Sequence, residues 1–391
     1  MRRLDRWVGV PLCFAATLLL RLSRLLRRRG STREGRLLCV ALAEMGSIVL
    51  AAPAIRRQAR AGGSAPVFVT LAPTRPVFDF LGGDFARDVF VLRSDRLATL
   101  CVDLWRFARW ARRMDVAVAV DLDPGARFSA LVALLSGAPR RAGFAGHGLP
   151  YRGALFTHPV DCTVERHMSD NFAALLHAPF GNARAAAGPA LHAAAPATPP
   201  AVERLRRLKR DTCRTRVLLV HANVSDAVPQ RRWPRARHAA LCRRLLAERD
   251  DLIVAFVGAE AEAAAAAALK DEIGDPHCLS VAGELAVAEL PALFAEATLM
   301  LSSDSGPAHF AAHAGLPVVA LFGPETPQRY RPLGDAVALY AALPCSPCLS
   351  PRNQRASACR DPRCMEAITL DAVLDEVRAR LDAPHRAQAS A

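Results

Sequence analysis

The stretch that decides the fold is residues 298–322, TLMLSSDSGPAHFAAHAGLPVVALF. Its apolar run at 298–302 predicts a buried strand, and the run at 317–322 predicts a second one. Between them, residues 307–314 are typical of a helix that has a proline in its first turn. A strand, a helix and a strand in this order indicate a parallel sheet with helices on both faces.

The same alternation extends outward from this stretch in both directions. We expect further strands at residues 37–43, 66–71, 89–92, 116–121, 217–220 and 252–257, and helices at 95–114, 126–135, 165–178, 234–247, 260–270 and 371–381. Residues 185–200 are mostly Ala, Pro and Gly without a periodic apolar face, which predicts a linker. The fold class is therefore α/β, with two doubly wound, Rossmann-like domains that we expect to face each other across a cleft.

This organisation gives five segments. They are a basic amphipathic segment at 1–35, an N-terminal domain at 36–184, the linker at 185–200, a C-terminal domain at 201–366, and a final helix and tail at 367–391.

Composition excludes several classes of protein. The 391 residues are 52% hydrophobic and 23% charged, which excludes a disordered chain. No apolar run reaches the roughly 20 residues of a spanning helix, so a polytopic membrane protein is excluded too. The net charge is +14, but aromatic residues make up only 6%, and we predict no nucleic-acid partner. Most of the eleven cysteines stand singly in apolar segments, which indicates a reducing compartment.

The first 36 residues carry ten arginines against two acidic residues. An uncharged stretch at 7–20 is too short to span a bilayer comfortably, and arginines follow it where a signal peptide would have a cleavage site. Arg21, Arg24 and Arg28 recur at helical spacing, which favours a helix lying on an anionic membrane surface. The alternatives are a helix packed on the protein's own surface and a true span.

The turn between the two deciding strands is a candidate anion site. Asp304, Ser305 and Gly306 stand where backbone N–H groups of a helix start can hold a phosphate or diphosphate. The alternative is an ordinary helix cap by Ser305 or Asp304. His309 follows on the same helix, and we expect its polar ring at the cleft, with His313 packed and no metal between them.

A second candidate contact with a diphosphate follows the strand at 217–220. Asn223 and Ser225 provide polar donors there, and Arg231 and Arg232 precede the next helix. The alternative is a solvated surface loop. Glu260, at a third strand-to-helix turn, could accept hydrogen bonds from ribose hydroxyls, unless it only complements the helix dipole.

In the first half, Glu44 precedes Gly46, which allows a tight turn after the first strand. A carboxylate in this position is suited to general base catalysis, although a structural glutamate at a helix start is the alternative.

These pieces, in this order, resemble glycosyltransferase family 9, the family of bacterial lipopolysaccharide heptosyltransferases. The residues that carry the resemblance are AEMGSIVLAAPAI at 43–55, PQRRWP at 229–234, FVGAE at 256–260 and SDSGPAHFAAHAGLPVVALFGP at 303–324. The resemblance covers about residues 36–382. It implies the GT-B architecture, with the sugar acceptor on the N-terminal half, the nucleotide-sugar donor on the C-terminal half, and a final helix that crosses back to the first half.

The resemblance also implies roles for individual residues. Ser305 and Gly306 fall where the family holds the donor diphosphate, and Asp304 where it contacts the donor. Near the family's other donor contacts lie Asn223, Ser225, Arg231 (with Arg232 as its rival) and Glu260 (with Glu262 as its rival).

One departure concerns the catalytic base. Many members have Met-Gly-Asp in the first loop, and its aspartate is the proposed base, whereas this chain has Met45, Gly46 and Ser47. Serine is a poor base at neutral pH without help, and Glu44 is the nearest carboxylate that could replace the aspartate.

A cluster of four cysteines lies near the C-terminus: Cys345, Cys348, Cys359 and Cys364. Four thiols in twenty residues could hold a structural zinc ion, although the spacing departs from that of a zinc ribbon. Unligated thiols and a disulfide are the alternatives, and a similar cluster in family members favours a local structural role.

The resulting prediction is an inverting glycosyltransferase that needs no cofactor beyond its nucleotide-diphosphate sugar. It would act on an envelope saccharide, such as the lipopolysaccharide core, as a peripheral protein on the cytoplasmic face of the membrane. The alternatives are a nucleotide-sugar epimerase of the same architecture and a catalytically degenerate, membrane-associated partner protein.

Overall fold

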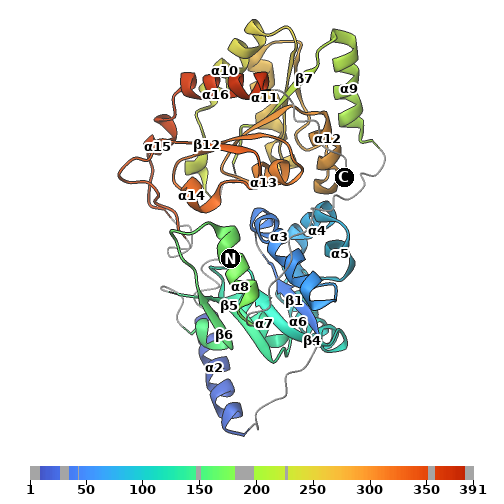
Figure 1. Ribbon diagram of the computed structural model, residues 1–391, viewed down its shortest axis with the longest axis vertical. Helices are drawn as coiled ribbons and strands as arrows, with labels where there is room; N and C mark the ends of the chain where they lie inside the picture. Colours follow the sequence, from blue (N-terminus) through green and yellow to red (C-terminus); the bar gives the residue numbers. More distant parts are fainter. Residues whose placement is uncertain are drawn as a thin grey trace. The chain divides into compact units, whose positions relative to one another are not determined.

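The computed structural model describes residues 9–26, 35–42, 44–146, 151–180, 198–224, 228–350 and 357–383. The chain forms two compact units (Figure 1). The N-terminal unit comprises residues 1–193 with 351–354, and the C-terminal unit comprises residues 194–350 with 355–391. Each unit is built around its own parallel sheet, so the predicted α/β fold class is confirmed.

The N-terminal sheet has six parallel strands in the order β3-β2-β1-β4-β5-β6. The strands are β1 (Arg36–Val40), β2 (Val67–Leu71), β3 (Val89–Leu92), β4 (Val116–Asp121), β5 (Arg140–Ala145) and β6 (His158–Asp161). The strand order reverses between β1 and β4, where Val40 pairs with Asp121. Loops that follow these two strands therefore lie together at the carboxyl edge, where open α/β sheets bind ligands.

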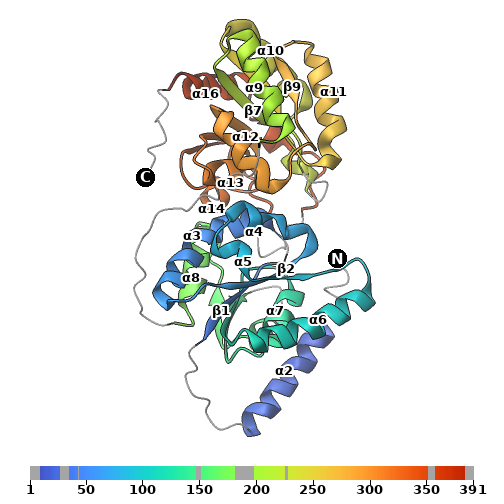
Figure 2. The same cartoon turned by 90° about the vertical axis from the view of Figure 1, so that its right-hand side faces the viewer.

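Helices cover both faces of this sheet (Figure 2). One face carries α3 (Met45–Gly62), α4 (Pro76–Leu81), α5 (Asp84–Arg87) and α8 (Met168–His177). The other carries α2 (Gly9–Leu26), α6 (Leu97–Arg113) and α7 (Arg127–Leu135), with α7 in contact with both of the others. Strands β1, β2 and β4 in the middle of this sheet are almost wholly buried, which explains why their sequences are nearly continuous apolar runs.

The C-terminal sheet repeats this topology, in the order β12-β11-β10-β7-β8-β9. Its parallel strands are β7 (Arg216–His221), β8 (Leu252–Phe256), β9 (Cys278–Ser280), β10 (Leu299–Ser303), β11 (Val318–Phe322) and β12 (Ala336–Tyr340). The order now reverses between β7 and β10, and Ser302 pairs with His221 there. The second unit thus has its own switch point, built from the stretch that decides the fold.

The helices of this unit are α9 (Pro200–Thr212), α10 (Arg235–Glu248), α11 (Ala263–Ile273), α12 (Leu290–Glu296), α13 (Gly306–His313), α14 (Pro327–Tyr330), α15 (Arg363–Glu366) and α16 (Leu370–Asp382). Short 3-10 turns precede three of them: η3 (Pro229–Arg231), η4 (Glu260–Glu262) and η5 (Val287–Glu289).

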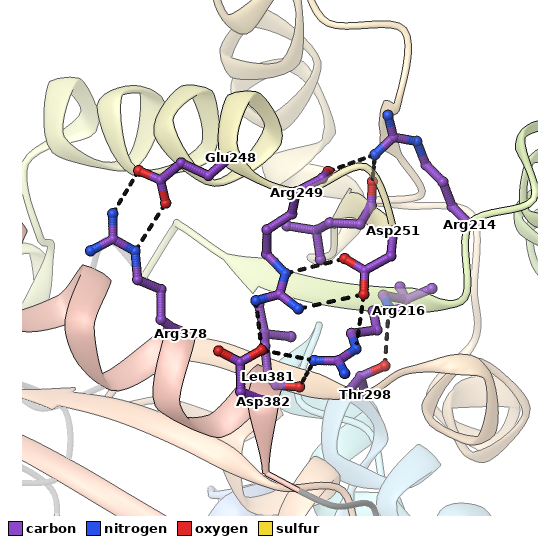
Figure 3. Close-up of polar contacts among 11 residues, drawn as sticks. Arg214, Arg216, Glu248, Arg249, Asp251, Thr298, Arg378, Leu381 and Asp382 are labelled. Atoms are coloured by element: carbon purple, nitrogen blue, oxygen red, sulfur yellow. Dashed lines mark hydrogen bonds and ion pairs between the residues drawn. The ribbon is translucent and has the colours of Figure 1, made fainter.

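The final helix, α16, packs on the C-terminal unit. Its buried face, Val373, Leu374, Val377 and Leu381, joins the core of that unit. Polar contacts surround this face (Figure 3): Arg378 binds Glu248 at 2.6 Å, and Asp382 accepts from Arg249 at 2.7 Å. The expectation that this helix crosses back to the first half is therefore wrong, because its apolar face is already covered by α10 and the sheet.

The N-terminal helix α2 packs on its own unit through one face. Cys13 and Thr17 are buried, and the helix contacts α7 and the 3-10 turn η2 (Gly153–Leu155). Its other face leaves Leu12, Phe14 and Leu18 about half exposed. The arginine side chains of this segment lie outside the described part of the chain. Among the described helices, none is both long and apolar enough to cross a bilayer.

A core substitution tests what holds α16 in place. Leu374 is 2% exposed, so Leu374→Ala should lower the free energy of unfolding of the C-terminal unit by about 2–4 kcal/mol. Arg378→Ala, on the half-exposed side of the same helix, should cost under about 1 kcal/mol. Urea denaturation measures both when it is followed by the fluorescence of Trp233, which is buried in this core, in a protein whose Trp7, Trp105 and Trp110 are replaced by Phe. Equal costs would mean that ion pairs hold the helix.

Candidate functional site

At the turn from β10 into α13, the Ser305 side chain contacts other residues and does not cap the start of the helix. Ser305 is the N-cap residue, but its hydroxyl does not cap the helix. Instead its Oγ lies 3.0 Å from Ser302 Oγ and 3.1 Å from His221 Nδ1. At Gly306 a Cβ would meet only the Phe310 ring, at 3.9 Å, so there is open space beside the backbone. The helix start is thus accessible to an anion.

His221 connects this turn to the neighbouring strand end at β8. Its Nε2 lies 3.3 Å from Glu262 Oε2, and the same carboxylate oxygen accepts from Ala259 N at 2.8 Å. Partial burial raises the pKa of Glu262, but the hydrogen bonds from His221 and Ala259 outweigh it and leave this pKa below its ordinary value. Glu262 is therefore engaged within the protein, whereas the side chain of Glu260 is exposed.

Arg231 reaches the same turn from the loop after β7. Its Nε lies 3.2 Å from Asp304 Oδ2, and its Nη1 donates to the Asp304 carbonyl at 3.4 Å. The two side chains are only 14% and 7% exposed, so this is a nearly buried ion pair. Such a pair is costly to break, because one charge would remain buried without its partner. Arg232, by contrast, is exposed.

The structure thus brings Arg231, Asp304 and Ser305 together and adds His221, which was not among the predicted site residues. Asn223 follows β7 and is half-buried, and Ser225 lies outside the described residues. His309 is only 6% exposed within α13, while His313 is half-buried. The ring of His309 is therefore more deeply buried than that of His313.

In the N-terminal unit, Glu44 stands directly before α3 as its N-cap residue. The hydroxyl of Ser47 donates to Glu44 Oε2 at 2.9 Å. The serine is therefore a hydrogen-bond donor to this carboxylate, and Glu44 is the group here that could accept a proton.

A second group of charges near Glu44 was not predicted from the sequence. Asp123 Oδ2 accepts from Leu42 N at 2.9 Å, and Asp121 binds Arg152 at 2.6 Å. Burial raises the pKa of Asp123 to about 7, and the charges of Asp121 and Glu44 act in the same direction. Two aspartates that end an apolar run, VAVAVDLD at 116–123, were the available signal.

The four C-terminal cysteines are all free thiols. Cys345 is exposed, Cys364 is buried, and the other two are half-buried. Among the described residues, no group of three or more His, Cys, Asp or Glu is placed to hold a metal ion. Instead Cys364 and Met365 pack against the bare backbone of Gly323, where a Cβ would come within 3.0 Å of Cys364 Sγ.

The sequence profile of glycosyltransferase family 9 (heptosyltransferase) matches residues 105–357, more than half of the chain. The chain belongs to this family. The match takes in most of α6, the acidic group around Asp121 and the whole Arg231–Asp304–Ser305 cluster, but it begins after Glu44.

Curated relatives in the family share shorter segments. Lipooligosaccharide heptosyltransferase 2 of Haemophilus influenzae is 31% identical over 115 residues, which are 28% of this chain and 32% of that protein. Lipopolysaccharide heptosyltransferase 2 of Salmonella typhimurium is 33% identical over 107 residues, 27% of this chain and 30% of that protein. The matches therefore span about a third of the length of these relatives.

Solved structures of the family agree with the fold. The E. coli ADP-heptose lipopolysaccharide heptosyltransferase II has a TM-score of 0.65 at 19% identity, over 88% of this chain and 98% of that one. A family 9 glycosyltransferase from Veillonella parvula has a TM-score of 0.67 at 18% identity, over 90% and 98%. At this identity the likeness shows the fold, and it confirms the predicted GT-B class of two Rossmann-like domains.

The pKa of Asp123 predicts how stability changes with pH. Its folded value, about 7, lies above the ordinary 3.8, so the folded protein binds more protons than the unfolded chain between these values. The stabilisation from the protonated carboxyl is therefore complete below about pH 4 and is lost as the pH rises through 7. Asp123→Asn keeps an acceptor for Leu42 and removes this dependence.

We expect Asp123→Asn to gain stability relative to the parent protein between pH 5 and pH 8, by about 2 kcal/mol. Calorimetric unfolding at several pH values measures this gain. Asp84→Asn is the matched control, because that carboxyl is already exposed in the same unit. A gain that does not change with pH would show that Asp123 ionises normally.

Proposed function

We propose that the protein is an inverting glycosyltransferase that moves heptose or a related sugar from a nucleotide-diphosphate donor to the lipopolysaccharide core or another envelope glycan. The single observation that carries this proposal is the cluster of Arg231, Asp304 and Ser305 beside the open helix start at Gly306. Family membership and the heptosyltransferase names of its relatives support the choice of sugar and acceptor.

The donor would bind to the C-terminal unit. Backbone N–H groups at the start of α13 and the guanidinium of Arg231 would hold the diphosphate, with the Ser305 hydroxyl positioned by His221. Asn223 and Ser225 follow β7 in the same loop and would add polar contacts, while His309 would support the helix from within. Glu260 is a better candidate than Glu262 for binding the ribose hydroxyls, because the Glu262 carboxylate is already hydrogen-bonded to His221 and to the backbone N–H of Ala259.

The reaction would then need two kinds of help. An acceptor hydroxyl attacks the anomeric carbon, the bond from that carbon to the diphosphate oxygen breaks, and the nucleoside diphosphate leaves. The positive helix start and Arg231 would stabilise the negative charge that grows on the leaving group. Glu44 would take the proton of the attacking hydroxyl as general base. No further cofactor is needed for these steps.

An acceptor that belongs to a lipopolysaccharide would be held in a membrane, which implies where the transfer would take place. We propose that the protein works as a peripheral protein at the cytoplasmic face of the membrane, with the basic N-terminal segment in contact with anionic headgroups. The half-exposed Leu12, Phe14 and Leu18 on the outer side of α2 support this placement.

A thermal-shift series tests the function directly, since a ligand that binds only the folded state raises the unfolding temperature. ADP-heptose is the first donor to test, because the structurally similar E. coli heptosyltransferase II is named for it. An assay of transfer to a lipopolysaccharide-core acceptor, with the released nucleoside diphosphate as its readout, then separates a transferase from an epimerase and from an inactive partner protein. Donor binding without transfer to any envelope saccharide would contradict the proposal.

Removal of Arg231, which is nearly buried, should weaken donor binding. We expect Arg231→Ala to raise the dissociation constant of the nucleoside diphosphate by at least about tenfold, because a charge-assisted contact is lost. Arg232→Ala is the matched control and should change it less than about threefold, since Arg232 is exposed. Isothermal titration measures both constants. A larger effect from Arg232→Ala would transfer the phosphate contact to that residue.

Neutralising the candidate base should stop chemistry without stopping binding. Glu44→Gln should lower kcat for transfer by at least about 100-fold, while the dissociation constant of the nucleotide stays the same. Ser47→Ala, which removes the hydroxyl that donates to Glu44, should retain most of the activity. Normal turnover by Glu44→Gln would eliminate Glu44 as the base, and Asp123→Asn would then be the next variant to assay.

A further inference from the structure

Exposed apolar side chains are concentrated on one layer of the N-terminal unit. Among the described residues, nine large hydrophobic side chains are exposed, and only Leu333 lies in the C-terminal unit. Six of the others belong to α2 and α6, one ends α7, and Tyr151 packs its ring against Phe14 at 5.3 Å. Their concentration on adjoining helices marks this layer as a surface that contacts something apolar.

These helices cover the same face of the sheet (Figure 2). Since α7 contacts both α2 and α6, the three form one continuous layer. The inner side of the layer belongs to the core, through residues such as Cys13 and Phe107. Exposed side chains on these helices therefore lie on the side that faces away from the sheet.

Helix α6 carries the most exposed part of this surface. Val102, Trp105 and Arg109 follow one another at helical spacing, and Trp105 is 61% exposed. The guanidinium of Arg109 lies over the Trp105 ring at 4.9 Å. Asp103, the helix's single acidic residue, is buried and bound by Arg93 at 2.8 Å. The outer face of α6 is therefore apolar at its start and cationic at its end.

The last turn of α6 adds more positive charge. Arg109, Arg112 and Arg113 are exposed, and no carboxylate in the described ranges forms an ion pair with them. An exposed tryptophan next to aliphatic and arginine side chains matches the chemistry of a bilayer interface, where the ring enters the headgroup region and the guanidinium groups bind phosphates.

We propose that the outer face of α6, together with the exposed side of α2, docks on an anionic lipid bilayer. The contact therefore extends well beyond the N-terminal segment and places the whole α2–α7–α6 layer against the membrane. This inference rests on the proposed membrane-associated function, which it refines by naming a second contact that is distant in sequence from the first.

Co-sedimentation of the full-length protein with vesicles tests this inference. The vesicles contain phosphatidylcholine alone or mixed with phosphatidylglycerol. We expect binding only to the anionic vesicles. The triple variant R109Q/R112Q/R113Q should weaken it about tenfold or more, because each arginine near an anionic surface contributes. The control R207Q/R243Q/R360Q removes three exposed arginines from the C-terminal unit and should bind like the parent protein.

The tryptophan provides a readout that a structural role would not change. Lipids with a spin label near the headgroup should quench the fluorescence of Trp105 on binding, and Trp105→Phe should lose that quenched component. Trp105→Ala should also weaken binding, whereas Leu333→Ala, which changes the exposed apolar residue of the other unit, should not. Unchanged thermal unfolding shows that each variant is folded.

The remaining outcomes separate the two proposals. Unchanged binding by the α6 variants, with binding lost in R21Q/R24Q/R28Q, would overturn the α6 contact and leave the N-terminal attachment intact. No binding of the parent protein to anionic vesicles would overturn both. If the α6 variants instead abolish self-association in solution, the surface is an interface between copies of this chain and the lipid proposal fails.

Discussion

The parallel pairing of β7 with β10 places His221 directly beside Ser302, at the edge where the strand order reverses. From this register follow the contacts of His221 with Ser305 and the arrival of Arg231 from the loop after β7 at Asp304. A parallel sheet brings all its carboxyl ends to one edge, so residues far apart in the chain meet there. The N-terminal sheet repeats the arrangement, with Val40 beside Asp121 and the loops of Glu44 and Asp123 following them.

The two switch points carry opposite electrostatic character. In the C-terminal unit Arg231 is paired with Asp304 beside an accessible helix start, whose backbone N–H groups favour negative charge. In the N-terminal unit, Asp121, Asp123 and Glu44 lie close enough for their charges to raise the pKa of Asp123. The proposed diphosphate contact would use the first environment, and the proposed uptake of a proton near neutral pH would use the second.

The layer of α2, α7 and α6 has a buried side that packs on its own unit and an outer side with exposed apolar residues. One side of α2 is held in the unit by Cys13 and Thr17, yet its other side leaves Phe14 and Leu18 in contact with solvent. Large apolar side chains that are exposed on adjoining helices are typical of a surface that binds a partner. The proposed docking of this layer gives the exposed apolar groups and the arginines of α6 a common partner.

Sequence alone determined most of the interior strands, many of the helices between them and the two-domain class, because a strand that is covered on both faces is usually a continuous apolar run. It also marked Glu44, Arg231, Asp304 and Ser305 as candidate site residues, since polar residues at strand ends are visible as interruptions of such runs. Edge strands β6, β9 and β12 were missed, and so was the interior strand β5. Its Arg141 is buried, and its guanidinium donates hydrogen bonds to backbone carbonyls. Strands β5, β6 and β9 lack the apolar run that the pattern requires, whereas β12 has one, AVALY at 336–340, and could have been predicted.

Tertiary structure alone decided which charges meet. Arg152 is 31 positions from Asp121, and Arg231 is 73 from Asp304, so no local pattern predicts either pair. Only the folded structure shows that His221 contacts the carboxylate of Glu262, which leaves Glu260 as the candidate for the ribose. The same holds for α16, whose amphipathic pattern predicts a buried face but leaves open which unit buries it. Long-range packing supplies that information, since it alone fixes which surfaces lose contact with water.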